Sequence, residues 1–111
     1  MKNDLINNPI IWSPSEERFK SSQMYLFMEN LNQSYNLKLK TFKELHEWSV
    51  LFKTDFWSNV WDFFNISGSK GKQPYIGPLN KMPGTKFFPD GKVNYAENML
   101  SGANTGLAIV F

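Results

Sequence analysis

Cysteine is absent from these 111 residues, and histidine and arginine each occur only once. Without cysteine there can be no disulfide, no cysteine-ligated zinc and no thiol nucleophile. Arg18 is the one arginine, the net charge is only +2, and the lysines are scattered along the chain. Nucleic-acid binding needs a concentrated basic surface, so we expect no nucleic-acid partner.

Long apolar runs are also missing. No stretch approaches the ~20 apolar residues that a membrane-spanning helix needs. Residues 1–9 are polar and lack the apolar core of a signal peptide. We therefore expect no membrane association and a cytoplasmic location.

Aromatic residues, in contrast, are abundant. They make up 16% of the chain, including ten Phe and four Trp, and 41% of all residues are hydrophobic. A chain of this length forms at most one domain, and such a composition can support a packed core. The rings therefore either fill that core or await the surface of a partner.

The stretch from Met82 to Leu100 carries the clearest local signals. Pro83-Gly84 and Pro89-Asp90-Gly91 predict two turns, because proline presets φ and glycine tolerates positive φ. Asn94 stands three residues before Glu97, a pattern typical of a helix N-cap with an acid reaching back to it.

Three further helices are predicted upstream. In the first, Ser13 caps, Pro14 takes the first helical position and Glu16 completes a capping box. Its apolar face is formed by Met24, Phe27, Met28 and Leu31.

The second helix begins with a capping box from Thr41 to Glu44 and breaks within residues 50–53. Thr54-Asp55 should cap the third helix, whose aromatic stripe we define as Phe56, Trp57, Val60, Trp61 and Phe64.

The remaining segments are a polar glycine-rich loop at 68–74, a second loop at 101–106 and an apolar run at 107–111. The apolar run predicts a buried strand of the kind found in parallel sheets. The fold class is therefore mostly α with irregular loops and a terminal β-strand.

Few residues invite a catalytic interpretation. His46 beside Glu47 could form an acid–base pair, but the second histidine of an HExxH zinc site is missing, and a structural role is favoured by roughly nine to one. The loop beginning at Gly68 departs from the phosphate-loop pattern, because Gly71-Lys72 is followed by Gln73, so we expect a flexible solvated loop.

Gly84-Thr85-Lys86 fails the same phosphate-loop test, and no G-x-S-x-G nucleophile motif occurs. The aromatic stripe could stack on a base or sugar, but such stripes form core about nine times in ten. The acids that attract notice are Asp62, Asp90 and three with cap roles, Glu16, Glu44 and Glu97. We assign no catalytic, cofactor-binding or metal-binding residue.

Several strings together resemble the N-terminal region of acetoacetyl-CoA synthetases, which are adenylate-forming acyl-CoA ligases. The strongest is the run from Met82 to Asn98, similar to MPG-x-x-WFP-G-x-x-LNYAEN with Phe87 for Trp and Val93 for Leu. I-W-x-P-S-x-E-R begins at Ile11, and F-M-x-x-L-N begins at Phe27. L-x-x-W-S-V and F-W-x-x-V-W-D-F-F follow in the second and third helices. The opening strings resemble acetoacetyl-CoA more than acetyl-CoA synthetases.

This resemblance implies an N-terminal helical region at 1–100, and at 101–111 a loop and the first strand of a nucleotide-binding domain that is not in the chain. It implies the N-terminal helical segment of a larger α/β adenylate-forming enzyme, with the remainder of the ligase as partner. ATP, Mg and CoA are implied for the full-length enzyme and none for this chain, whose role would be structural and inert alone. An acetyl-CoA synthetase-type fragment, a free-standing helical interaction module and a small aromatic ligand-binding domain remain alternatives.

Overall fold

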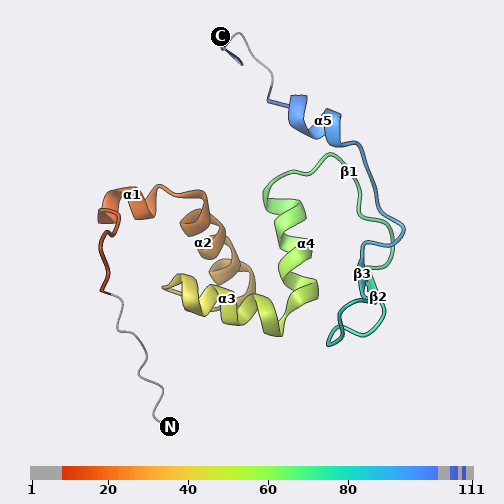
Figure 1. Ribbon diagram of the computed structural model, residues 1–111, viewed down its shortest axis with the longest axis horizontal. Coiled ribbons are helices and arrows are strands. Elements are labelled where there is room, and N and C mark those ends of the chain that lie inside the picture. Colours follow the sequence, from red (N-terminus) through yellow and green to blue (C-terminus); the bar gives the residue numbers. More distant parts are fainter. Residues whose placement is uncertain (1–8, 103–105, 108, 110–111) are drawn as a thin grey trace. The chain divides into compact units, whose positions relative to one another are not determined.

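The computed structural model divides the chain into two compact units, Met1–Leu39 and Lys40–Phe111, and describes residues 9–102, 106–107 and 109. Helices predominate, which confirms the mostly α class (Figure 1). Unit 1 contains α1 (Glu16–Lys20) and α2 (Gln23–Tyr35). Unit 2 contains α3 (Phe42–Leu51), α4 (Lys53–Phe63), β1 (Gly68–Ser69), β2 (Tyr75–Ile76), β3 (Lys86–Phe87), β4 (Lys92–Val93) and α5 (Tyr95–Leu100).

The start of α1 differs from the prediction. Ser15, not Ser13, is the N-cap, and its hydroxyl accepts a hydrogen bond from the Arg18 N–H at 3.3 Å. Pro14 therefore precedes the helix, and Glu16 forms an exposed ion pair with Lys20 at 2.6 Å. The sequence offers two serines with equal capping ability, and the second one is used.

The predicted first helix is in fact two helices. Ser22 separates them: its hydroxyl donates to the Phe19 carbonyl and accepts from the Tyr25 N–H, so it closes α1 and caps α2. Serine competes for main-chain groups in this way, which explains why it interrupts helices as well as starting them.

The predicted apolar face of α2 is largely confirmed. Phe27, Met28 and Leu31 are at most 3% exposed, whereas Met24 is 49% exposed. Met24 lies in the first turn of α2, directly after the interruption at Ser22.

In unit 2, the predicted capping box of α3 is confirmed. Thr41 accepts from the Glu44 N–H, and the Glu44 carboxylate accepts from the Thr41 N–H at 2.9 Å. Leu45 and Trp48 of this helix are buried. These contacts fix both the first residue and the inward face of α3.

The predicted break between α3 and α4 is confirmed, but the predicted cap at Thr54-Asp55 is wrong. The N-cap is Phe52, which has no side-chain cap hydrogen bond. Its carbonyl accepts from the Phe56 N–H at 2.8 Å. Because α4 begins one residue after Phe52, Thr54 already lies inside the helix.

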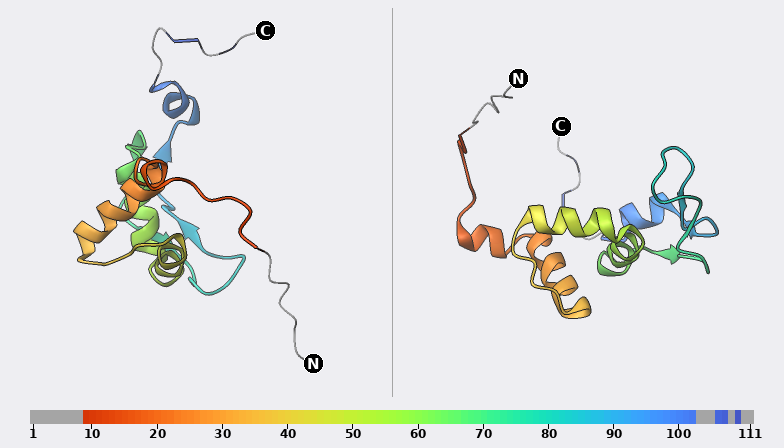
Figure 2. Two further views of the ribbon diagram at one scale, coloured as in Figure 1. Left: turned by 90° about the vertical axis from the view of Figure 1, so that its left-hand side faces the viewer. Right: turned by 90° about the horizontal axis from the view of Figure 1, so that it is seen from below.

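Four two-residue strands, which the sequence analysis did not predict, form two nested antiparallel pairs. β1 pairs with β4, and β2 pairs with β3, which lie between β1 and β4 in the sequence and form a separate two-stranded sheet (Figures 1 and 2). Gly68 in β1 has φ +145°, and a Cβ there would collide with the Lys92 carbonyl oxygen. The glycine therefore allows the close approach of β1 to β4.

The two predicted turns and the cap at Asn94 are confirmed. The Gly91 N–H donates to the Phe88 carbonyl at 2.8 Å, and Asn94 accepts from the Glu97 N–H at the start of α5. In the predicted strand at 107–111, Leu107 and Ile109 belong to no strand and are exposed. Residues 108, 110 and 111 of that prediction lie outside the described residues.

Candidate functional site

The aromatic pair Phe87-Phe88 lies against the aromatic stripe of α4. The ring centroids of Trp57 and Phe87 are 6.1 Å apart, and those of Trp61 and Phe88 are 5.2 Å apart in an edge arrangement. Phe88 takes a left-handed φ of +47°, which is uncommon outside glycine. The stripe thus contacts the nested strands, but the predicted core role is borne out only in part, because no residue of α4 is buried and Trp57 and Phe64 are 45% and 49% exposed.

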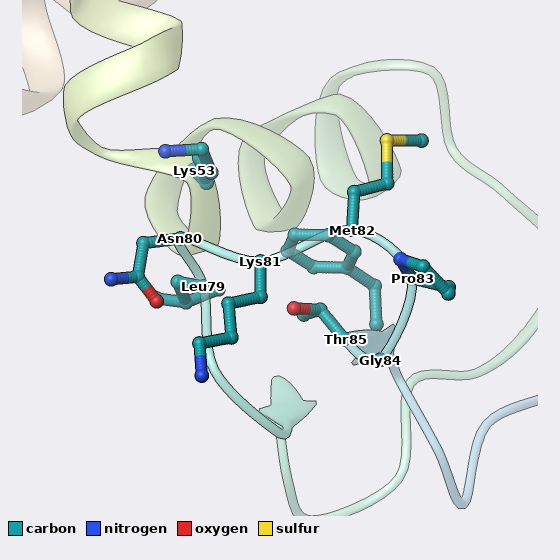
Figure 3. Close-up of a pocket in the computed structure, with 9 residues that line it drawn as sticks. Lys53, Leu79, Asn80, Lys81, Met82, Pro83, Gly84 and Thr85 are labelled. Carbon is teal, nitrogen blue, oxygen red and sulfur yellow. The ribbon is translucent and has the colours of Figure 1, made fainter.

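A pocket of about 630 Å³ opens beside this aromatic contact. It is lined by Lys53, Leu79, Asn80, Lys81, Met82, Pro83, Gly84, Thr85 and Phe87. Figure 3 shows Lys53 on the side of Asn80, away from Pro83. Most of these residues belong to the loop between β2 and β3, in which the Thr85 hydroxyl donates a hydrogen bond to the Pro78 carbonyl. The sequence analysis missed this pocket, because it depends on how the loop closes.

The lining of the pocket limits its chemistry. Of the nine described residues that form it, none is an acid or a histidine. Lys53 donates its ammonium to the Val50 carbonyl at 2.6 Å. The pocket can hold an apolar group, but it lacks a general base or an activated nucleophile.

The glycine-rich loop at 68–74 is more regular than predicted. Its first two residues form β1, and the Lys70 ammonium bonds the Asp62 carboxylate at 2.7 Å and the Ser58 hydroxyl at 3.3 Å. Lys70 therefore holds the loop against α4, and its ammonium group is engaged there by Asp62 and Ser58.

Asp90 links the segment between β3 and β4 to the segment between β1 and β2. Its carboxylate accepts the Lys72 N–H at 2.8 Å and the Gln73 N–H at 3.5 Å. The main-chain N–H of Lys72 holds the pKa of Asp90 below its ordinary value of 3.8. A Cβ on Gly71 would lie 2.5 Å from the carboxyl carbon, so glycine gives the carboxylate room.

His46 and Glu47 line a pocket of about 340 Å³ on α3 together with Val50 and Leu51, but each of the two side chains contacts another neighbour. The His46 ring stacks on Phe42 with centroids 6.3 Å apart, and Glu47 faces Lys43 at 3.9 Å. Both are exposed on α3. These contacts support the structural interpretation over an acid–base pair.

Glu44 has main-chain partners at the start of α3. The main-chain N–H groups of Lys40 and Thr41 hold the pKa of Glu44 below its ordinary value of 4.5. Within the described ranges, no group of three or more His, Cys, Asp or Glu could hold a metal ion. In the same part of the chain, every helix is too short or too polar to cross a membrane. The cytoplasmic location stays a prediction.

Comparison with known proteins identifies relatives along most of the chain. It is 33% identical over 92 residues to malonamoyl-CoA synthetase vrtB of Penicillium aethiopicum, covering 82% of this chain and 12% of that protein. It is 32% identical over 98 residues to acetoacetyl-CoA synthetase of Xenopus tropicalis, and the match covers 87% of this chain and 14% of that protein. The Rhizobium meliloti acetoacetyl-coenzyme A synthetase is 28% identical over 101 residues, covering 91% and 15%.

The chain is thus homologous to CoA synthetases, a class of ligases. Its curated homologues are acetoacetyl-CoA synthetases or a related CoA synthetase, as the sequence strings predict. The chain spans about an eighth to a seventh of the length of these relatives. No family model matches it. No solved structure matches it.

Proposed function

We propose that this chain is the N-terminal helical segment of an acetoacetate–CoA ligase and has a structural role there. The ligase would activate acetoacetate with ATP to an acyl-adenylate and pyrophosphate. It would then transfer the acyl group to CoA and release AMP. ATP, Mg and CoA would bind to the rest of the enzyme.

The observation that carries this proposal is the extent of the homology. Similarity to CoA synthetases covers 82–91% of this chain but only 12–15% of three relatives. The aromatic pair of the resembling motif also has a packing role in unit 2, against α4. This packing of its distinctive residues against each other supports a structural role for the segment.

We further propose that the segment is inert alone. The strongest candidates for chemistry are engaged locally: Asp90 by main-chain N–H groups, Lys70 by Asp62, and Glu44 by its capping box. Among its described lining residues, the pocket beside Phe87 has lysines but no carboxylic acid and no histidine. Adenylate formation needs groups that orient and neutralise phosphates, and such groups must come from elsewhere in the ligase.

The test begins with the native gene product. Sequencing the coding DNA beyond the Phe111 codon, with an intact mass of the native protein, establishes its length. AMP release is then measured with ATP, CoA and acetoacetate for the native product and for the 111-residue chain. We expect the native product to be active and the chain to match the blank.

Two results would contradict the proposal in different ways. AMP release by the 111-residue chain would show that it is not inert. A native product that ends at Phe111 and releases no AMP would exclude the ligase and favour the helical interaction module. Parallel assays with malonamate and acetate decide between acyl substrates, because one relative is named for malonamoyl-CoA.

A further inference from the structure

α5 presents an apolar face that nothing in the described part of unit 2 covers. Tyr95, Met99 and Leu100 are 76%, 62% and 68% exposed. At 3.6 residues per turn, positions 95, 96, 99 and 100 fall within an arc of ~140° on the helix surface. The apolar side chains of this six-residue helix therefore form one continuous stripe.

The other side of α5 is fixed to the chain upstream. The Asn98 amide donates to the Ser67 carbonyl at 3.0 Å, and its oxygen accepts the Ser67 N–H at 2.8 Å. Asn98 lies outside the apolar arc, on the side that Glu97 also occupies. These paired bonds set the direction of the helix and leave the stripe facing away from Ser67.

A helix this short does not persist through its own hydrogen bonds. Helices below about 12 residues are marginal in water and depend on tertiary packing of their apolar side. In α5, the cap at Asn94 and the bonds of Asn98 are polar, and no residue of the helix is buried. The packing that such a helix normally has must come from another part of the protein.

We propose that the α5 face, defined as Tyr95, Met99 and Leu100, is the surface on which the remaining chain of the ligase docks. This inference rests on the proposed function. The occupant follows from the relatives, of which this chain spans only 12–15%, so most of the ligase lies outside the segment. The partner surface is apolar and accommodates two side chains one helical turn apart, Tyr95 and Met99.

The test is thiol labelling of the full-length ligase, once its AMP release has been measured. Met99→Cys is introduced, with Lys43→Cys as the control, because Lys43 is a charged residue whose side chain is 84% exposed in the described structure. Labelling by N-ethylmaleimide is followed by peptide mass, and each native rate is divided by the rate of the same variant in urea. Peptide mass separates the introduced thiol from any cysteine elsewhere in the ligase.

Exposures of 62% for Met99 and 84% for the Lys43 side chain would by themselves separate the two normalised rates by less than about twofold. We expect Cys labelling at position 99 to be at least about tenfold slower in the native ligase than in urea, and labelling at position 43 to differ less than about threefold. Leu100→Cys provides a second reading of the same face.

The possible failures are distinguishable. Labelling at both 99 and 100 within about threefold of the urea rates, in a ligase that releases AMP, would overturn the docking surface and leave the proposed function standing. A full-length product with no AMP release would instead count against the proposed function. Labelling is read by mass, so its result does not depend on the activity of the variants.

Discussion

Two asparagine side chains each pair with both main-chain groups of one residue elsewhere in their unit. Asn32 donates to the Leu39 carbonyl at 2.9 Å and accepts the Leu39 N–H at 2.8 Å. Asn98 does the same with Ser67, 31 positions away in the sequence. An amide side chain carries a donor and an acceptor, as a peptide group does, so it can replace a strand neighbour. At the residue scale, these two asparagines hold segments of the chain together through the same kind of hydrogen bonds that join neighbouring strands in a sheet.

Replacing Asn98 should therefore destabilise unit 2 beyond the loss of one contact. Asn98→Ala leaves both main-chain groups of Ser67 without these bonds, and it also removes a bond from the amide to the Asn94 carbonyl. We expect a loss of about 1–3 kcal/mol in the free energy of unfolding. Urea unfolding followed by tryptophan fluorescence measures it.

Asn98→Asp is the discriminating control for this prediction. Its carboxylate can still accept the Ser67 N–H but cannot donate to the Ser67 carbonyl. The urea midpoint of Asn98→Asp should lie between those of the wild type and Asn98→Ala. A wild-type midpoint for Asn98→Ala would show that the pairing contributes nothing to stability.

At the scale of elements, side-chain caps set most helix starts. Ser15, Ser22, Thr41 and Asn94 each accept the main-chain N–H three residues later. α4 is the exception, because Phe52 precedes it without a side-chain cap. Phe52 is both the residue after α3 and the residue before α4, so α4 follows α3 directly and begins without a side-chain cap.

This difference predicts unequal effects for two threonines. Thr41→Ala should lower the free energy of unfolding by about 1 kcal/mol, because it removes the acceptor for the Glu44 N–H at the start of α3. Thr54→Ala should have little effect or stabilise slightly, because Thr54 lies inside α4, where alanine is the better helix former. Urea midpoints of the two variants measure the contrast. Equal losses would mean that Thr54 acts as a cap after all.

At the scale of the whole molecule, large apolar side chains are exposed in both units, and the described residues bury only five apolar side chains. Hydrogen bonds from carboxylates to the main chain therefore contribute to the stability of unit 2 alongside this small apolar core. Glu44 closes the start of α3, and Asp90 links the segment between β3 and β4 to the segment between β1 and β2. Both carboxylates accept main-chain N–H groups, which lowers the pKa of each.

The acid sensitivity of unit 2 follows from these lowered pKa values. A carboxyl whose pKa is lower in the folded state adds stability above its unfolded pKa, and that stability is lost as the pH falls through the folded value. We expect the double variant Glu44→Gln/Asp90→Asn to show a smaller drop in urea midpoint than the wild type between about pH 6 and pH 2. Identical pH profiles for the two proteins would contradict this role.

Much of the local structure could be predicted from the sequence. The Thr41 capping box, the Asn94 cap, the turns around Phe87-Phe88 and the buried face of α2 all follow from neighbours within a few residues. The predicted cap at Ser13 is wrong because Ser15, two residues later, caps α1 instead, and the predicted cap at Thr54 is wrong because α4 begins after Phe52 without a side-chain cap. The aromatic stripe of α4 was predicted to pack, but its partners Phe87 and Phe88 could not be named from spacing.

The sequence by itself determined where α3 and α5 start, which residues turn the chain, and the homology to CoA synthetases, because each depends on residues close together or on strings that can be compared directly. Only the tertiary structure decided the two nested strand pairs, the hydrogen bonds of Asp90, the Asn98–Ser67 pairing and the pocket beside Phe87. Strands of two residues are too short to show an alternating pattern. Hydrogen bonds across 17 to 31 positions form only when the fold brings their partners together.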